Sequence, residues 1–141
     1  MEGRGHHHPP CGFYARCDLA HVGDSLKFHE WIDNVLVTYH VVGAHGATLY
    51  AAGQDIANLL LSPLRGKFKG FPPTMLVSGT RDLILSQTVL LHCKLRQAGV
   101  TADLHLLESA SRFTYFIEPF APGSQHIFAQ MSQFFDEHLG S

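Results

Sequence analysis

A chain of 141 residues with 45% hydrophobic and only 16% charged side chains can enclose a core, which excludes an intrinsically disordered protein. Its formal net charge of −2 gives no general attraction to phosphate, so we expect no nucleic-acid partner. The sequence has no run of 18 apolar residues and no apolar stretch typical of a signal peptide, so we expect no membrane span and a cytoplasmic location.

Residues 1–22 show neither a helical nor a strand period, and glycines and prolines interrupt them, so we predict an irregular, mobile N-terminal segment. Cys11 and Cys17 could form a disulfide bridge, although nothing indicates an oxidising compartment. We predict no bound metal ion, because adjacent histidines next to prolines rarely converge on one ion. We also predict no other cofactor. A metal-binding segment on an inert domain is an alternative, with the candidate ligands His6, His7, His8, Cys11 and Cys17.

The next part of the chain gives mixed signals. Trp31, Val35, Leu36 and Tyr39 recur at helical spacing and predict a helix, and a second short helix is expected over residues 47–52.

Clearer signals begin with the turn-rich residues 62–73. Residues 74–78 form a continuous apolar run, which predicts a strand buried on both faces of a parallel sheet. After a loop at residues 79–82, we expect a helix capped by Ser86, containing Cys93 as a buried thiol and ended by Gly99.

Residues 101–106 alternate polar and apolar side chains, as expected of a strand at the edge of the sheet. An irregular loop is expected over residues 108–123, and Ser124 is predicted to cap a last helix that ends at Gly140. Strand, helix, strand and helix at these lengths predict an α/β fold with parallel strands and covering helices.

Reactive groups of open parallel sheets collect on the loops that follow the strands. Asp82 follows the first predicted strand, and the segment of residues 109–112 follows the second. We therefore expect these two loops to face one crevice.

Five blocks of sequence carry a family resemblance when they are taken in order. They resemble the C-terminal part of the hormone-sensitive-lipase-like branch of the α/β-hydrolases, and the resemblance covers roughly residues 23–140. The blocks are LSPL at 61–64, GFPPT at 70–74, GTRD at 79–82, LRQAGV at 95–100 and FF at 134–135. The resemblance implies a partial α/β-hydrolase domain over residues 23–141 and bacterial esterases or lipases as relatives.

This family uses a serine on a sharp elbow, a carboxylate and a histidine. The resemblance places Asp82 at the position of the triad acid, directly after Gly79-Thr80-Arg81, and Arg112 at the position of the histidine. His105 and His126 lie nearby in sequence but do not align with that position. The sequence contains no G-x-S-x-G elbow and no upstream His-Gly-Gly loop.

The resemblance therefore implies a truncated carboxylic-ester hydrolase that is catalytically incomplete or weak, with a small acyl ester or lactone as its substrate if it is active. An esterase with a rebuilt site is an alternative, in which a nearby histidine and Asp82 would act with one of four serines, Ser78, Ser86, Ser109 and Ser111. An exposed strand edge also predicts self-association.

Overall fold

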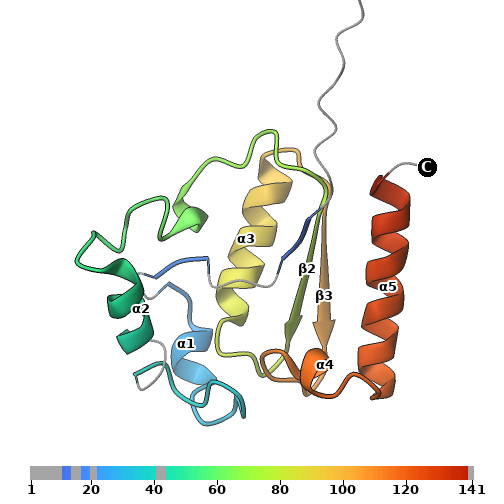
Figure 1. Ribbon diagram of the computed structural model, residues 1–141, viewed down its shortest axis with the longest axis horizontal. Helices are drawn as coiled ribbons and strands as arrows, with labels where there is room; N and C mark the ends of the chain where they lie inside the picture. Colours follow the sequence, from blue (N-terminus) through green and yellow to red (C-terminus); the bar gives the residue numbers. More distant parts are fainter. Residues whose placement is uncertain (1–10, 14–16, 20–21, 41–43, 140–141) are drawn as a thin grey trace, which may run out of the picture.

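The computed structural model describes residues 11–13, 17–19, 22–40 and 44–139. One or more helices follow each strand along the chain, as Figure 1 shows. In chain order they are β1 (Cys11–Phe13), α1 (Ser25–Phe28), α2 (Ala44–Ala51), the 3-10 helix η2 (Pro63–Arg65), β2 (Thr74–Gly79), α3 (Leu85–Gln97), β3 (Ala102–Leu107), α4 (Thr114–Ile117) and α5 (Pro122–Leu139).

The strands form a parallel sheet in the order β1-β2-β3. β2 and β3 pair along their whole length, from Thr74 opposite Ala102 to Gly79 opposite Leu107. Every residue of β2 is buried, whereas β3 is only partly covered. The predicted parallel strands, their connecting helix and the edge position of the second predicted strand are therefore confirmed in the described sheet.

The two faces of the sheet are covered by different helices, α3 on one side and α5 on the other (Figure 1). Because neighbouring residues of a strand point to opposite faces, β2 contributes to two separate cores. Leu76 packs with Leu91 and Leu95 of α3. Met75 and Val77 lie in the cluster that contains Ile127 and Phe134 of α5.

The ends of the helices differ from the prediction in their caps. The helix α3 begins at Leu85, so Ser86 lies inside it and does not cap it. The backbone N–H of Ser86 is instead bound by the hydroxyl of Ser25, from a distant segment. Gly99, with a φ of 78°, follows α3 as predicted.

Helix α5 begins earlier than predicted, at Pro122, so the prediction of Ser124 as its cap is wrong. Proline suits a first helical position because it has no N–H to leave unpaired. The predicted end at Gly140 lies outside the described residues. Helix α4 interrupts the segment that was expected to be irregular.

The helix predicted from Trp31 to Tyr39 is wrong. Trp31 and Val37 both have positive φ values, 65° and 57°, which break a right-handed helix. The carboxylate of Asp33 accepts the N–H groups of Val35 and Leu36, which removes donors that a helix would use. The short helix expected over residues 47–52 is confirmed as α2, which begins three residues earlier.

β1 lies within the N-terminal segment that was expected to be irregular, and this expectation is wrong for residues 11–13. Three residues are too few to show a strand period, and their conformation depends on pairing with β2. Residues 1–10 of this segment lie outside the part of the chain that the structure describes. Within the described residues, no helix is long and apolar enough to cross a membrane.

Candidate active site

The acid turn, residues 79–86, begins where β2 ends. Its central side chain is Asp82, which is fully buried. One carboxylate oxygen, Oδ2, accepts a hydrogen bond of 2.8 Å from the Ser78 hydroxyl, and Oδ1 accepts the Ile84 N–H at 2.9 Å. These two bonds engage both carboxylate oxygens and fix the plane of the buried carboxylate.

The arginine loop, residues 108–113, follows β3 and lies against the acid turn. The N–H of Arg81 donates to the carbonyl of Ala110 at 2.9 Å, and the Ser109 N–H donates to the hydroxyl of Thr80 at 2.9 Å. The two loops therefore lie in contact with each other, and the crevice that we expected them to face stays a prediction. Positive φ values at Ser109 and Phe113, 60° and 58°, bracket the tight bend of the arginine loop.

The close approach of the two loops requires a glycine at the end of β2. A Cβ atom built on Gly79 would lie 2.0 Å from the carbonyl oxygen of Ala110 and 2.5 Å from its carbonyl carbon. Both atoms belong to the backbone and cannot rotate away. Gly79 thus sets the distance between the acid turn and the arginine loop.

Arg112 is half-buried, and its guanidinium lies 4.9 Å from the centre of the Phe113 ring. Its charge also acts on two buried neighbours. Burial raises the pKa of Tyr115 to about 12, while the Arg112 charge lowers it and the Asp82 charge raises it. The Tyr115 phenol is therefore within electrostatic range of both Asp82 and Arg112.

The thiol of Cys17 is the second group near Arg112. Burial raises the pKa of Cys17 to about 11, with a smaller lowering effect from the Arg112 charge. The charge of Arg112 thus acts on both buried groups, Cys17 and Tyr115.

Comparison with known proteins agrees with this arrangement. A family model described as the α/β-hydrolase fold matches residues 13–112. This chain belongs to the α/β-hydrolase family. The α/β class and the partial α/β-hydrolase fold expected from the sequence are confirmed.

Solved structures of esterases superimpose on this α/β-hydrolase chain. Esterase E25 is 45% identical, with a TM-score of 0.84 over 86% of this chain and 37% of E25. An esterase of the bacterial hormone-sensitive lipase family is 23% identical, with a TM-score of 0.81 over 88% of this chain and 41% of that one. A mutant of esterase E40, also 23% identical, gives a TM-score of 0.82 over 89% of this chain and 41% of that structure.

These matches confirm the resemblance to the hormone-sensitive-lipase-like branch. The α/β-hydrolase chain spans about two fifths of the length of the structures it matches. A search of curated proteins gave no match.

Each of the four serines considered for a rebuilt site has a hydrogen-bond partner other than a histidine. Ser78 is bound to Asp82, Ser86 to Ser25, Ser109 to Glu108, and Ser111 accepts the backbone N–H of Asn34. Among the residues that the structure describes, no serine hydroxyl is hydrogen-bonded to a histidine ring. His105 is half-buried on β3, and His126 is exposed on α5.

The candidate metal segment receives no support from the described residues. His6, His7 and His8 lie outside them, and the remaining described chain contains no cluster of three or more metal-ligating side chains. Cys17 is buried, and the side chain of Cys11 lies outside the described part of the structure, so a bridge between these two residues is not tested. Cys93 is exposed, so its predicted burial is wrong; it lies on the outer side of α3, opposite Leu91 and Leu95.

Sequence reasoning missed a set of buried polar residues around the acid turn. Gln87 is fully buried, and its amide accepts the N–H groups of Cys17 and Asp18 and donates to the carbonyl of Asp18. Asp33 is also buried and accepts the N–H of Leu83 at 2.8 Å. These partners lie 50 to 70 positions apart in the chain, so local sequence patterns give no sign of them.

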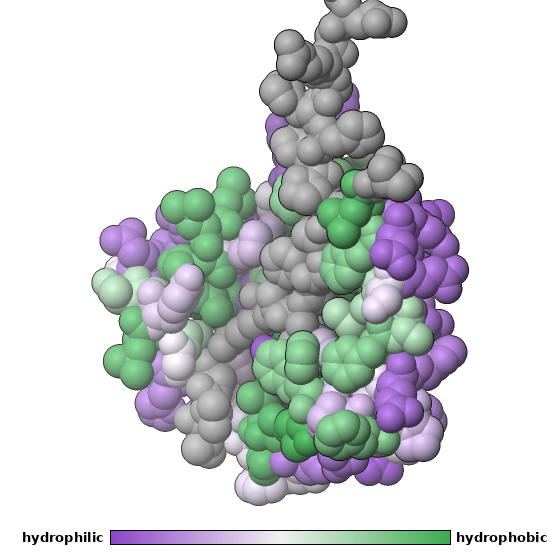
Figure 2. All heavy atoms as spheres, turned by 45° about the vertical axis from the view of Figure 1, so that its right-hand side comes forward, coloured by the Kyte–Doolittle hydropathy of each residue, from purple (hydrophilic) through white to green (hydrophobic). Residues whose placement is uncertain are grey.

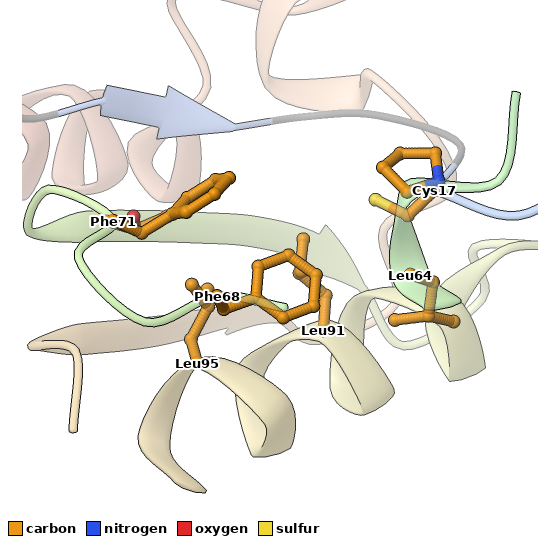
Figure 3. Close-up of a pocket in the computed structure, with 8 residues that line it drawn as sticks. Cys17, Leu64, Phe68, Phe71, Leu91 and Leu95 are labelled. Carbon is orange, nitrogen blue, oxygen red and sulfur yellow. The ribbon is translucent and has the colours of Figure 1, made fainter. Parts of the chain in front are cut away.

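A small apolar cavity of about 70 Å³ lies apart from the acid turn, between α3 and the segment before β2 (Figure 3). Its lining is entirely apolar except for Cys17 and Thr74, with Pro63, Leu64, Phe68, Phe71, Leu91 and Leu95. None of these residues belongs to the acid turn or to the arginine loop. The cavity is therefore a packing feature beside the site.

Proposed function

We propose that this chain carries the acid and base loops of a carboxylic-ester hydrolase of serine-hydrolase descent, and that it is catalytically incomplete or weak. The observation that supports this proposal is the placement of Asp82. It is buried directly after a parallel strand, bound by Ser78 and Ile84, in a turn hydrogen-bonded to the loop that bears Arg112.

In a complete triad, a carboxylate at this position accepts the N–H of an imidazole and stabilises the imidazolium formed during acyl transfer. Arg112 occupies the position of that imidazole. A guanidinium remains protonated at neutral pH and accepts no hydrogen bond, so it cannot remove the proton of a serine hydroxyl. The proposed result is a site with an acid and no general base.

The proposed substrate is a small acyl ester or a lactone, as suggested by the esterases among the structural neighbours. A serine nucleophile without its base loses most of its rate advantage, because removal of a triad serine or histidine costs about 10⁶-fold in kcat. Any activity of this chain should then be independent of the Asp82 carboxylate.

We expect purified protein to hydrolyse p-nitrophenyl butyrate at no more than a background rate. Asp82→Asn should share that rate, as should the control Asp136→Asn on the exposed face of α5. A fluorophosphonate probe, followed by mass mapping, should label no serine. A burst of product with one labelled serine, abolished by Asp82→Asn, would instead establish the rebuilt-site alternative.

We also propose self-association through the open edge of β3. In the described sheet, β3 pairs with β2 on one side only, and Leu106 on this strand is 45% exposed. Near the end of the strand, Phe116, Ile117 and Phe120 are exposed as well. Figure 2 shows hydrophobic side chains as continuous areas on the visible face, and such areas favour association.

The protein should therefore be a dimer or larger at micromolar concentration. A lysine on the strand edge opposes pairing, so Leu106→Lys should weaken association by at least about tenfold. Leu60→Lys is a suitable control, because Leu60 is 88% exposed but lies outside the sheet. Light scattering during gel filtration measures the mass, and a wild-type monomer over the whole concentration range would refute the proposal.

A further inference from the structure

One short segment, residues 23–33, supplies most of the side-chain contacts to the backbone of the acid turn. Ser25, at the start of α1, is buried, and its hydroxyl donates to the carbonyl of Leu83 at 2.9 Å. The same hydroxyl accepts the N–H of Ser86 at 2.9 Å, and the Ser86 hydroxyl accepts the N–H of Ser25 at 3.0 Å. The two serines thus join the beginning of α1 to the beginning of α3.

Two further side chains of the segment bind the turn at its centre. The ring of His29 lies with Nδ1 2.9 Å from the carbonyl oxygen of Asp82. Because a carbonyl only accepts, Nδ1 carries the proton in this hydrogen bond. The buried carboxylate of Asp33 accepts the N–H of Leu83 at 2.8 Å, and its other oxygen holds its own loop through Val35 and Leu36.

The approach of the segment to the acid turn is unusually close. A Cβ atom on Gly23, whose φ is 109°, would lie 2.4 Å from the Cβ of Ser86. Only glycine therefore fits there without displacing the start of α3. The segment thus lies tightly against Ser86 at one end and is joined to the turn by side chains along the rest.

We infer that Ser25, His29 and Asp33 are positioning residues that fix the direction of the Asp82 carboxylate. The inference rests on the proposed function of Asp82 as the acid that orients an imidazole. Backbone groups of Asp82, Leu83 and Ser86 are held from outside the turn. The turn therefore cannot rotate without breaking these bonds and the bond from Ile84 to the carboxylate.

Positioning of this kind matters because the carboxylate has to meet the imidazole in one plane. A misplacement of about 1 Å in a reacting group can cost about a hundredfold in rate. The positioning role can be measured without an assay of ester hydrolysis if an imidazole is introduced at position 112. In the Arg112→His variant, the Asp82 carboxylate would lie at hydrogen-bonding distance from the new imidazole. Its negative charge should raise the imidazole pKa by about one to three units.

The experiment measures two quantities in the Arg112→His protein. Nuclear magnetic resonance gives the pKa of the imidazole introduced at position 112. Amide hydrogen exchange gives the protection of the backbone N–H groups of Leu83 and Ser86. Ser25→Ala is the main test, because it changes no charge and removes two bonds to the turn. Asp33→Asn is a second variant for the exchange measurement only, because its charge change would itself alter the imidazole pKa.

Ser62→Ala is the matched control. Ser62 is also fully buried. Its hydroxyl accepts the N–H of Leu19 and donates to the carbonyl of Ile56 and the carboxylate of Asp18, so at least as many bonds are lost, away from the acid turn. We expect Ser25→Ala to lower the imidazole pKa by about half a unit or more, because the Asp82 carboxylate would no longer be aligned with the imidazole N–H. Exchange at Leu83 or Ser86 should accelerate by about tenfold or more in Ser25→Ala and in Asp33→Asn. Ser62→Ala should change neither quantity.

The outcomes separate the inference from the proposed function. If Asp82→Asn leaves the imidazole pKa of the Arg112→His protein unchanged, the proposed role of Asp82 is wrong, and exchange alone then tests the bracing of the turn. If Asp82→Asn lowers the imidazole pKa while Ser25→Ala and Ser62→Ala give the same imidazole pKa, the proposed positioning role is wrong. Unchanged exchange at both amides in Ser25→Ala and Asp33→Asn also overturns the inference.

Discussion

Replacing Gly79 with alanine is expected to destabilise the folded protein by roughly 3 kcal/mol, which is a large fraction of the stability of a small domain. The added Cβ would lie 2.0 Å from the carbonyl oxygen of Ala110, far inside contact distance. Relief requires the arginine loop to move away from the end of β2. That movement would stretch the hydrogen bond between the Arg81 N–H and the Ala110 carbonyl, which is 2.9 Å long.

Gly46→Ala is the matched control for this substitution. Gly46 lies inside α2, and a Cβ there meets nothing within 4 Å. Alanine restricts the unfolded chain and favours the helix, so a gain of about 0.5–1 kcal/mol is expected. Urea unfolding followed by circular dichroism measures both changes. Equal midpoints for the two variants would show that the loops separate without cost.

The central part of the fold was predictable because its signals are local. The apolar run of β2 reflects burial on both faces of the sheet, and Gly99 marks the end of α3 where a positive φ is needed. β1 escaped prediction because its three residues are a strand only through their pairing with β2, 63 positions later in the chain: Cys11 pairs with Thr74 and Phe13 with Leu76. The predicted helix over residues 31–39 failed because apolar spacing carries no information about the positive φ of Trp31 and Val37.

The candidate site was predictable to the extent that it follows from parallel strands. Asp82 and Arg112 come after neighbouring strands of one sheet, so the chain order of strands and loops was enough to place their loops together. Their bracing was not predictable. Ser25 and Asp33 bind the acid turn across 50 to 61 positions of sequence, and a serine or an aspartate near a turn is common in any loop.

The second large effect that we predict is a loss of folded-state stability at alkaline pH. Cys17 and Tyr115 are both buried, and burial raises their pKa values from 9.0 to about 11 and from 10.0 to about 12. In each case the folded state favours the neutral form more strongly than the unfolded chain does. Their contribution to stability is therefore fully present below the unfolded pKa and is lost as pH rises through the folded one.

For Cys17 this loss falls between about pH 9 and 11, and for Tyr115 between about pH 10 and 12. Since one pKa unit corresponds to about 1.4 kcal/mol, we expect a loss of roughly 3 kcal/mol at pH 11 from the two groups together, most of it from Cys17. Urea midpoints at pH 8 and pH 11 measure this difference.

Substitutions assign the alkaline loss to the two groups. Cys17→Ala should reduce the difference between pH 8 and pH 11 by about 2 kcal/mol, and Tyr115→Phe by about 1 kcal/mol, because neither replacement ionises. Cys93→Ala is the control, since it removes an exposed thiol in place of a buried one. All variants keep the same lysines, so any effect of the lysines cancels in the comparison. An alkaline loss that persists undiminished in Cys17→Ala would mean that this thiol is hydrated in the folded state. The apolar cluster that Cys17 forms with Leu64, Leu91 and Leu95 would then be open to water, contrary to the packing on the α3 side of the sheet.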